Sequence, residues 1–253
     1  MIRLLLYTAP SPAGDLALEE SIQLALEDGS SPTTWRIWQP YQPAVVLGTG
    51  QEAAREVELD AAKTGQIEVL RRHSGGGAVV IGPGIINFSV FHQFKDLPGS
   101  DSIRGAMMAS LKPIVQLLAG WKIQACDAGL SDLAVVSEDG TLRKIAGNAQ
   151  ARKKISVLVH GTLLANPDWA RLSGLLKHPS KVPEYRVGRD HRAFLTCLKD
   201  LRAPYDMDSF VNGLLAVLGP NIAVKREPEA AEAARAQQLV ENKYGDPAWN
   251  YRR

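Results

Sequence analysis

The sequence has few cysteines, few aromatic residues and no long hydrophobic run. Cys126 and Cys197 are its only cysteines in 253 residues, which excludes a disulfide framework, and no Cys/His cluster has zinc-ligand spacing. The leucines at positions 4–6 are far too few to span a bilayer, and no signal-peptide pattern precedes Asp15. These absences predict a cytoplasmic protein without a metal site and without a membrane partner.

A strong excess of one charge is also missing. The formal net charge is +2, and the basic residues are spread along the chain, so no nucleic-acid partner is expected. A content of 45% apolar and 22% charged residues is typical of a soluble globular protein with a substantial core. We expect residues 1–253 to form one domain, with 221–253 as a helical C-terminal extension.

The spacing of apolar residues predicts alternating strands and helices. Alternation predicts strands at 2–7, 35–38, 44–48 and 85–91, and a meander of strands over 133–164. Helical spacing predicts helices at 14–27, 57–64, 102–118, 210–218 and 227–242. The pattern is that of an α/β protein.

Residues 71–80 read RRHSGGGAVV and lie between two apolar stretches, 67–70 and 78–81. Glycines lack Cβ atoms, so their N–H groups can approach an anionic ligand closely, and the two arginines can offer forked donors. A glycine triplet alone is equally typical of a tight turn beside solvated arginines. The buried strands predicted on both sides favour the ligand-binding loop. The spacing does not match the G-x-G-x-x-G of a parallel Rossmann sheet.

Four further motifs follow the glycine loop. They read NFS at 87–89, SDL at 131–133, RKIAGNAQ at 143–150 and HGTLL at 160–164. In order and spacing the set resembles lipoate-protein ligase A, in the superfamily that also contains biotin ligases and octanoyl transferases. The arginine-glycine pattern is closer to the lipoate branch than to biotin ligases. The resemblance implies an α/β (α+β) fold with a mixed, largely antiparallel sheet covered by helices.

The resemblance also implies an activity and its substrates. It implies transfer of a lipoyl or octanoyl group through an acyl-adenylate to a lysine of a lipoyl domain, such as that of a dehydrogenase E2 or a glycine cleavage H-like protein. ATP and Mg²⁺ would be substrates together with lipoate or octanoate, and no cofactor would be permanently bound. Lys144 would contact the activated carboxyl group as the catalytic residue, although a solvated strand lysine is the simpler interpretation of Lys144 taken alone. The residues implied to bind substrate or adenylate are Arg71, Arg72, Ser74, Gly75, Gly76, Gly77, Ala78, Asn87, Asp132, Gly147, Asn148, His160, Gly161 and Thr162.

Two departures from the ligase pattern stand out. Many ligases follow the glycine-loop strand with a His-Asp-x-Gly-Asn element, whereas residues 81–85 here read IGPGI. We also expect no accessory C-terminal domain of the kind that longer ligases carry, which would leave activation to a separate accessory chain. His160, expected at a strand edge, is interpreted as a residue that shapes the pocket rather than as a general base.

Cys126 supports a rival mechanism. It precedes the SDL motif by what reads as a short loop, close to where cysteine-dependent octanoyl transferases of this superfamily place their nucleophile. A thiolate there would form an acyl thioester and pass the chain to a lysine without nucleotide. Asp127 beside it would raise the pKa of the thiol, and the intact glycine triplet favours the ligase. A binder of acylated carriers without catalytic activity is the third interpretation.

Overall fold

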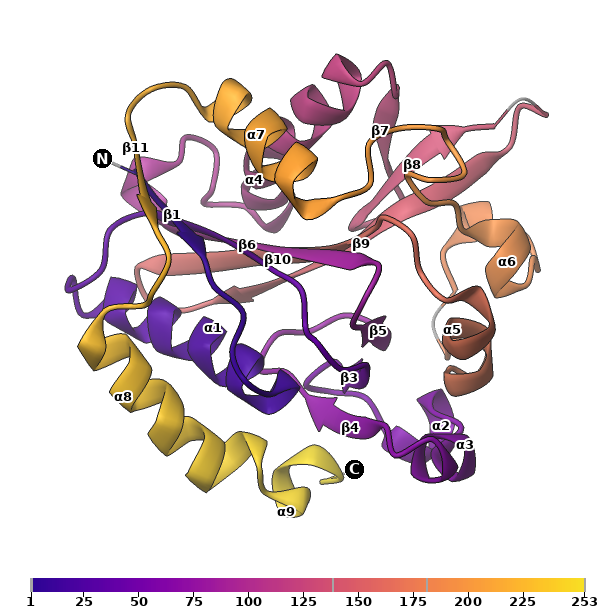
Figure 1. Cartoon of the computed structure of the whole chain (residues 1–253), viewed down its shortest axis with the longest axis horizontal. Helices are drawn as coiled ribbons and strands as arrows, with labels where there is room; N and C mark the ends of the chain where they lie inside the picture. Colours follow the sequence, from indigo (N-terminus) through magenta and orange to yellow (C-terminus); the bar gives the residue numbers. More distant parts are fainter. Residues whose placement is uncertain (1, 138, 181, 253) are drawn as a thin grey trace.

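The computed structural model describes residues 2–137, 139–180 and 182–252. Within these ranges, eight strands form a main sheet in the order β11-β1-β2-β6-β10-β9-β8-β7 (Figure 1). Strand β1 pairs in parallel with β2 and β11, and all other neighbours in this sheet are antiparallel. The predicted mixed, largely antiparallel sheet covered by helices is therefore confirmed. The strands span Ile2–Leu6 (β1), Thr34–Trp38 (β2), Ile85–Gln93 (β6), Ala125–Ala128 (β7), Asp132–Val136 (β8), Leu142–Arg152 (β9), Ser156–Leu164 (β10) and Ile222–Lys225 (β11).

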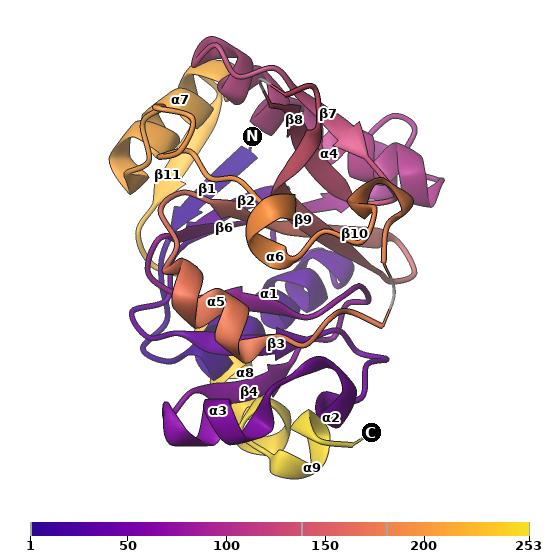
Figure 2. The same ribbon diagram turned by 90° about the vertical axis from the view of Figure 1, so that its right-hand side faces the viewer.

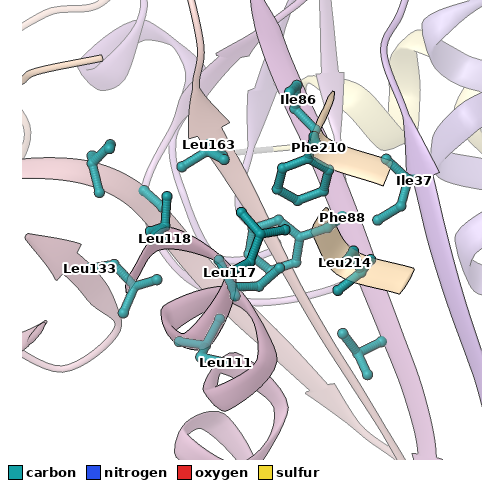
Figure 3. Close-up of a cluster of buried hydrophobic side chains, with 14 of the residues drawn as sticks. Ile37, Ile86, Phe88, Leu111, Leu117, Leu118, Leu133, Leu163, Phe210 and Leu214 are labelled. Atoms are coloured by element: carbon teal, nitrogen blue, oxygen red, sulfur yellow. The ribbon is translucent and has the colours of Figure 1, made fainter. Parts of the chain in front are cut away.

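Helices cover both faces of the main sheet. Helices α4 (Ile103–Gly120) and α7 (Met207–Leu218) lie on one face, and α1 (Pro12–Glu27) and α8 (Ala230–Leu239) lie on the other (Figure 1). Figure 3 shows the apolar core beneath α4 and α7, where Phe88, Leu118 and Phe210 are fully buried. Each such side chain contributes about 1.5–3 kcal/mol by leaving water. This core makes the main sheet a rigid base for the site.

Helix α1 is held on the sheet by its own N-terminal turn. Ser11 caps the helix by accepting a hydrogen bond from the Gly14 N–H, with Pro12 as the first helical residue. One turn further on, Asp15 forms a fully buried ion pair with Arg36 of β2. Burial raises the pKa of Asp15 to about 6, although Arg36 opposes the shift. The pair sets the rotation of α1, and thereby the direction in which Glu19 points.

A second, three-stranded sheet carries the glycine loop. Strand β3 (Ala44–Leu47) lies between β4 (Glu68–Arg71), to which it is parallel, and β5 (Val79–Ile81), to which it is antiparallel. The connection from β4 to β5 must therefore cross the carboxyl end of β3, which places residues 72–78 beside Gly48. Short helices flank this sheet in Figure 2: α2 (Ala53–Glu56), α3 (Leu59–Thr64) and α5 (Trp169–Leu175). Helix α6 (His191–Phe194) lies next to α5 and packs against β9 of the main sheet.

Several predicted elements differ in the structure. The helix predicted over 57–64 begins two residues later, as α3, because Val57 is extended and forms a bridge with Leu176. The segment predicted to be helical from 221 begins with β11, which extends the main sheet beside β1. Helix α8 continues as a π-helix over Val240–Tyr244, followed by α9 (Pro247–Asn250). Two 3-10 turns occur at Phe94–Asp96 and Glu184–Arg186. No helix within the described ranges is long and apolar enough to cross a membrane.

One stability prediction concerns His92, which is buried in β6 and whose Nε2 has no partner among the described residues. Burial lowers the pKa of His92 from 6.5 to about 4, with Asp96 opposing the shift. Between pH 6.5 and 4 the unfolded chain therefore binds a proton at His92 while the folded chain does not. The free energy of unfolding consequently falls as the pH is lowered through that window. The decrease in the free energy of unfolding from pH 7 to pH 5, measured by urea titration, should be about 1–2 kcal/mol smaller in His92→Gln than in wild type.

The control for this prediction is His178→Gln, because His178 is exposed. That variant should keep the wild-type dependence on pH. Parallel pH profiles for wild type and His92→Gln would contradict the assignment of a neutral, buried His92.

Candidate active site

A cavity of about 1110 Å³ is lined by residues of the main sheet, the small sheet and the segment 176–195. The structure brings most of the expected site residues into its wall. Those that line it are Arg72, Gly75, Gly76, Gly77, Ala78, Asn87, Asp132, Lys144, Gly147, Asn148, His160, Gly161 and Thr162. Arg71, Ser74 and Cys126 are not part of the lining.

The glycine loop is packed closely against the end of β3. Gly76 has a φ of +88°, a conformation that side chains rarely adopt. A Cβ atom on Gly48 would lie only 2.1 Å from the carbonyl oxygen of Gly76. A Cβ on Gly75 or Gly77 would meet nothing within 4 Å, so these two glycines border open space. Gly48 is a loop-shaping residue that the sequence motifs did not mark.

Arg71 lies behind the loop rather than in the cavity wall. Its guanidinium group donates hydrogen bonds to main-chain carbonyl oxygens, including those of Gly48 (3.0 Å), Gln51 (2.6 Å) and Asn250 (2.9 Å). Each of its three guanidinium nitrogens donates to at least one main-chain carbonyl oxygen. The geometry of Arg71 is therefore that of a brace between the small sheet and the C-terminal segment.

Arg72 holds the glycine loop from within. Its Nη2 donates to the carbonyl oxygens of Gly75 (2.5 Å) and Gly77 (2.8 Å), and its Nε donates to Ser74 Oγ (2.9 Å). Burial lowers the pKa of Arg72 to about 10, with Glu19 opposing the shift, so the group stays charged at neutral pH. With the carbonyls turned toward Arg72, the loop's shape is set before any ligand binds.

Lys144 is held in the cavity wall by a carboxylate on the neighbouring strand. Its Nζ lies 2.8 Å from Asp132 Oδ1, and the Tyr185 hydroxyl donates to Asp132 Oδ2 at 2.8 Å. A Cβ atom on Gly147 would lie 2.7 Å from Lys144 Nζ, so glycine is needed for the lysine side chain to follow this path. Burial and the charge of Asp132 raise the pKa of the Tyr185 hydroxyl, which remains a proton donor.

His160 is part of a buried hydrogen-bonded chain. Its Nε2 lies 2.7 Å from Ser74 Oγ, and its Nδ1 lies 3.0 Å from Glu19 Oε2. Burial opposes the ionisation of Glu19, but His160 and the hydroxyl of Ser89 outweigh it and lower the pKa of Glu19 to about 2. His160 lies in β10, between β6 and β9, which corrects the expected edge position. The chain of contacts ties the glycine loop to the main sheet.

Gly161 makes room for the amide of Asn148. A Cβ atom on Gly161 would lie 2.1 Å from Asn148 Oδ1 and 2.5 Å from the ring of Phe88. The Asn148 Nδ2 donates to the carbonyl oxygen of Ser131 at 2.7 Å, whereas Oδ1 has no partner among the described residues. The cavity wall therefore contains a buried acceptor on β9, the strand that also carries Lys144.

Cys126 lies in strand β7, ahead of the short turn that leads into the SDL motif. Its exposed thiol contacts the carbonyl oxygen of Ala134 at 3.6 Å. Pairing places Cys126 opposite Ala134 and Ala134 opposite Lys144, so the three form one row across β7, β8 and β9. Two strand spacings put the Cα atoms of Cys126 and Lys144 roughly 10 Å apart. Cys197 is buried, as its leucine-rich surroundings predict.

The segment 176–195 closes one side of the cavity and was missed by the sequence reasoning. It contributes Tyr185, His191 and Arg186, whose side chain is only 3% exposed. It contains neither a glycine motif nor a regular spacing of apolar residues, so no sequence pattern indicated that it belongs to the site. Glu19 was missed for another reason: its helical spacing from Asp15 was visible, but its direction depends on the Asp15–Arg36 pair.

The C-terminal segment braces the base of the glycine loop. Trp249 Nε1 donates to the carbonyl oxygen of Arg71 (2.8 Å), and the Arg71 N–H donates to Asn250 Oδ1 (2.9 Å). The hydroxyl of Tyr244 lies 3.2 Å from Nδ1 of His73. Burial lowers the pKa of His73 to about 4, so the imidazole is neutral. In the described part of the chain, no group of three or more His, Cys, Asp or Glu could hold a metal ion.

Comparisons with known proteins agree with this geometry. The model of the lipoyl protein ligase A/B catalytic domain matches residues 11–219. The octanoyltransferase LipM of Symbiobacterium thermophilum is 30% identical over 270 residues, covering 96% of this chain and 95% of the relative. A bi-partite lipoate protein ligase from Thermoplasma acidophilum, described with its E2 lipoyl domain, superposes with a TM-score of 0.82 at 28% identity, covering 98% and 95% of the two chains. A lipoate-protein ligase A bound with ATP gives 0.80 at 27% identity, covering 98% of each chain.

The fold and the glycine-lined cavity define a catalytic domain of the biotin/lipoate ligase superfamily. Within that superfamily, the chain belongs to the lipoyl protein ligase A/B catalytic domain family. Its relatives include both lipoate ligases and octanoyltransferases.

Proposed function

We propose that this protein is an ATP-dependent ligase that joins a lipoyl or octanoyl group to a lysine of a lipoyl domain through an acyl-adenylate. One observation carries the proposal: a single cavity of about 1110 Å³ has both the glycine triplet and Lys144 in its wall. Pockets for one small ligand usually enclose about 300–1,000 Å³, so this cavity has room for an acyl chain together with a nucleotide.

The two sides of the cavity suit the two parts of an acyl-adenylate. Apolar side chains such as Leu16, Trp38 and Val46 line it beside the glycine loop, where an acyl chain would be out of water. Lys144 supplies a fixed positive charge at the polar side. Preorganised charges of this kind stabilise the negative charge that develops when a carbonyl group is attacked.

The reaction proceeds in two steps that conserve atoms. The acyl carboxylate attacks the α-phosphorus of ATP, so that an acyl–phosphate bond forms and pyrophosphate leaves. The neutral amine of the acceptor lysine then attacks the acyl carbon. The amide bond forms, the acyl–oxygen bond to AMP breaks and one proton is released. Mg²⁺ enters as part of the ATP substrate. In this proposal Lys144 contacts the acyl carbonyl and the phosphate in the second step.

The proposed acceptor is a lipoyl domain of a dehydrogenase E2 or a glycine cleavage H-like protein. Support comes from the Thermoplasma acidophilum relative, whose structure is described together with an E2 lipoyl domain. The same relative is described as bi-partite, which supports the further proposal that a separate accessory chain completes activation here. The acceptor remains the same whether or not that chain is needed.

The testing experiment is an acceptor-modification assay followed by mass spectrometry. Purified protein is mixed with an apo lipoyl domain, octanoate or lipoate, Mg²⁺ and ATP, and in parallel with an octanoylated carrier protein without ATP. The proposal expects acylation of the acceptor only when ATP is present. Acylation of the acceptor only from the carrier would contradict the ligase and support the transferase. Binding of the acylated carrier without any transfer would contradict both enzymes and support a non-catalytic binder.

A second candidate function is a transferase in which Cys126 forms an acyl thioester. Two observations favour it: the relative LipM is an octanoyltransferase matched over 95% of its length, and the exposed Cys126 shares a cross-strand row with Lys144. Against it, Cys126 lies outside the cavity lining, and no histidine is hydrogen-bonded to its thiol in the described ranges. The ligase is therefore ranked first.

The variant Cys126→Ser separates the two mechanisms. We expect it to retain at least about half of the wild-type rate, because an adenylate is attacked directly by the acceptor lysine and a small replacement in an exposed edge strand disturbs little packing. The measurement is the initial rate of ATP-dependent acceptor acylation. A hydroxylamine-sensitive acyl adduct on Cys126, together with loss of transfer in the serine variant, would support the transferase instead.

A further inference from the structure

The terminal nitrogens of Arg186 have no hydrogen-bond partner among the described residues. Arg186 is 3% exposed, and its side chain donates one hydrogen bond, from Nε to the carbonyl oxygen of Arg189 at 2.8 Å. Its Nη2 is buried without a partner, and no described residue accepts a hydrogen bond from Nη1. Leaving a buried charged donor unpaired is unfavourable, so this arrangement requires an explanation.

Other buried arginines in the described part of the chain are used differently. Arg36 is paired with Asp15, and Arg3 is paired with Glu232. Arg72 donates to the carbonyl oxygens of its own loop. Even the neighbouring Arg189 donates to the carbonyl oxygens of Leu142 and Tyr185. Of the two arginines in the cavity wall, Arg72 is thus engaged by the protein, and Arg186 keeps two donors available.

Arg186 lines the cavity, and no carboxylate among the described residues accepts a hydrogen bond from its guanidinium group. The ring of Phe194 lies 5.0 Å from its guanidinium carbon and packs against it. Burial lowers the pKa of Arg186, and the negative charge of Asp190 opposes that shift. The Asp190 carboxylate itself caps helix α6 by accepting a hydrogen bond from the Ala193 N–H.

The acidic residues of the cavity wall are committed elsewhere. Asp132 is paired with Lys144, Glu19 accepts from His160, and Glu56 accepts from Ser180. Glu184, the fourth, is exposed. None of the four accepts a hydrogen bond from Arg186.

We propose that Arg186 is an anion-binding residue of the cavity, whose guanidinium group takes an oxyanion of the substrate. An arginine fork matches the paired oxygens of a phosphate or a carboxylate, which are the two oxyanions that the proposed reaction brings to this cavity. Tyr185, the preceding residue, is hydrogen-bonded to Asp132, so Arg186 belongs to the same wall as Lys144. The identity of the oxyanion rests on the proposed function, whereas the anion site itself does not.

The test is calorimetric binding to wild type, Arg186→Gln and Arg186→Lys. The ligands are a non-hydrolysable ATP analogue with Mg²⁺ and, separately, octanoate. Arg186→Gln should weaken one of them about 10- to 100-fold, as expected for lost hydrogen bonds to a charged group. Weaker nucleotide binding identifies a phosphate, and weaker octanoate binding identifies a carboxylate. Arg186→Lys keeps the charge without the fork, so its affinity should lie between those of wild type and Arg186→Gln. The matched control is Arg192→Gln, because Arg192 is half exposed, pairs with Asp200 and lies outside the cavity lining.

A second measurement is independent of the proposed function. Inorganic pyrophosphate should raise the melting temperature of wild type and of Arg192→Gln, but not that of Arg186→Gln. If wild type binds neither nucleotide nor octanoate, the proposed function fails while the pyrophosphate result still decides the anion site. Equal affinities for both ligands and equal stabilisation by pyrophosphate in wild type and Arg186→Gln would overturn the proposal.

Discussion

Replacement of Lys144 by alanine should lower the rate of acceptor acylation about 10²- to 10³-fold, the loss typical of removing one preorganised donor from a transition state. The ammonium group is held in place by Asp132 at 2.8 Å, so little reorganisation is needed when charge develops nearby. The side chain is 24% exposed, and its removal should leave the core packing unchanged. The appropriate measurement is a single-turnover assay with preformed acyl-adenylate, which bypasses the activation step.

The control for Lys144→Ala is Lys154→Ala, which removes an exposed charge beyond the end of β9. Its single-turnover rate and melting temperature should equal those of wild type. Lys144→Ala should differ from this control in rate only. A wild-type rate for Lys144→Ala would remove Lys144 from the mechanism.

The second large effect is expected at Gly48, which carries no expected ligand contact of its own. A Cβ atom there would lie 2.1 Å from the carbonyl oxygen of Gly76, so Gly48→Ala must displace the glycine loop. Overpacking of this kind costs about 1–3 kcal/mol, and its relief by loop movement should weaken binding of a non-hydrolysable acyl-adenylate analogue about 10- to 100-fold. Calorimetric titration of the analogue provides the measurement.

A matched glycine exists for this experiment in helix α5. A Cβ atom on Gly174 meets nothing within 4 Å, so Gly174→Ala introduces the same methyl group without a clash. This variant should bind the analogue as wild type does and be slightly more stable, because alanine favours helix. Equal affinities for Gly48→Ala and Gly174→Ala would show that the loop's position does not govern ligand binding.

Local sequence patterns predicted the long helices well, whereas the arrangement of the sheet followed from the family resemblance. The period of apolar residues placed α1 and α4 within a few residues of their observed bounds, because helices that cover a sheet show a regular stripe. The motifs also marked the glycine loop and Lys144, which line one cavity. Strand β11 escaped detection because four residues are too few to show a period. Its place in the sheet depends on pairing with β1, more than 200 residues away in sequence.

The roles of the arginines could not be predicted from the same patterns. Residues 71 and 72 stand next to three glycines, which suggests phosphate donors, yet both guanidinium groups donate to main-chain carbonyl oxygens. For Arg71, one of these acceptors is Asn250, which local sequence cannot associate with it. Arg186 lies in a segment without any motif, and only the packed structure shows that its terminal donors have no partner among the described residues.

The bracing of the glycine loop by the C-terminal segment has a consequence for synthesis of the chain. Arg71 and Asn250, which are hydrogen-bonded in the structure, are 179 positions apart. At about 5–20 residues per second, a ribosome needs roughly 10–40 s to make the chain between them. During that time the nascent polypeptide contains every glycine of the loop but lacks the Trp249 and Asn250 contacts at its base. Binding competence should therefore appear late in translation, after the strands of the main sheet have been made.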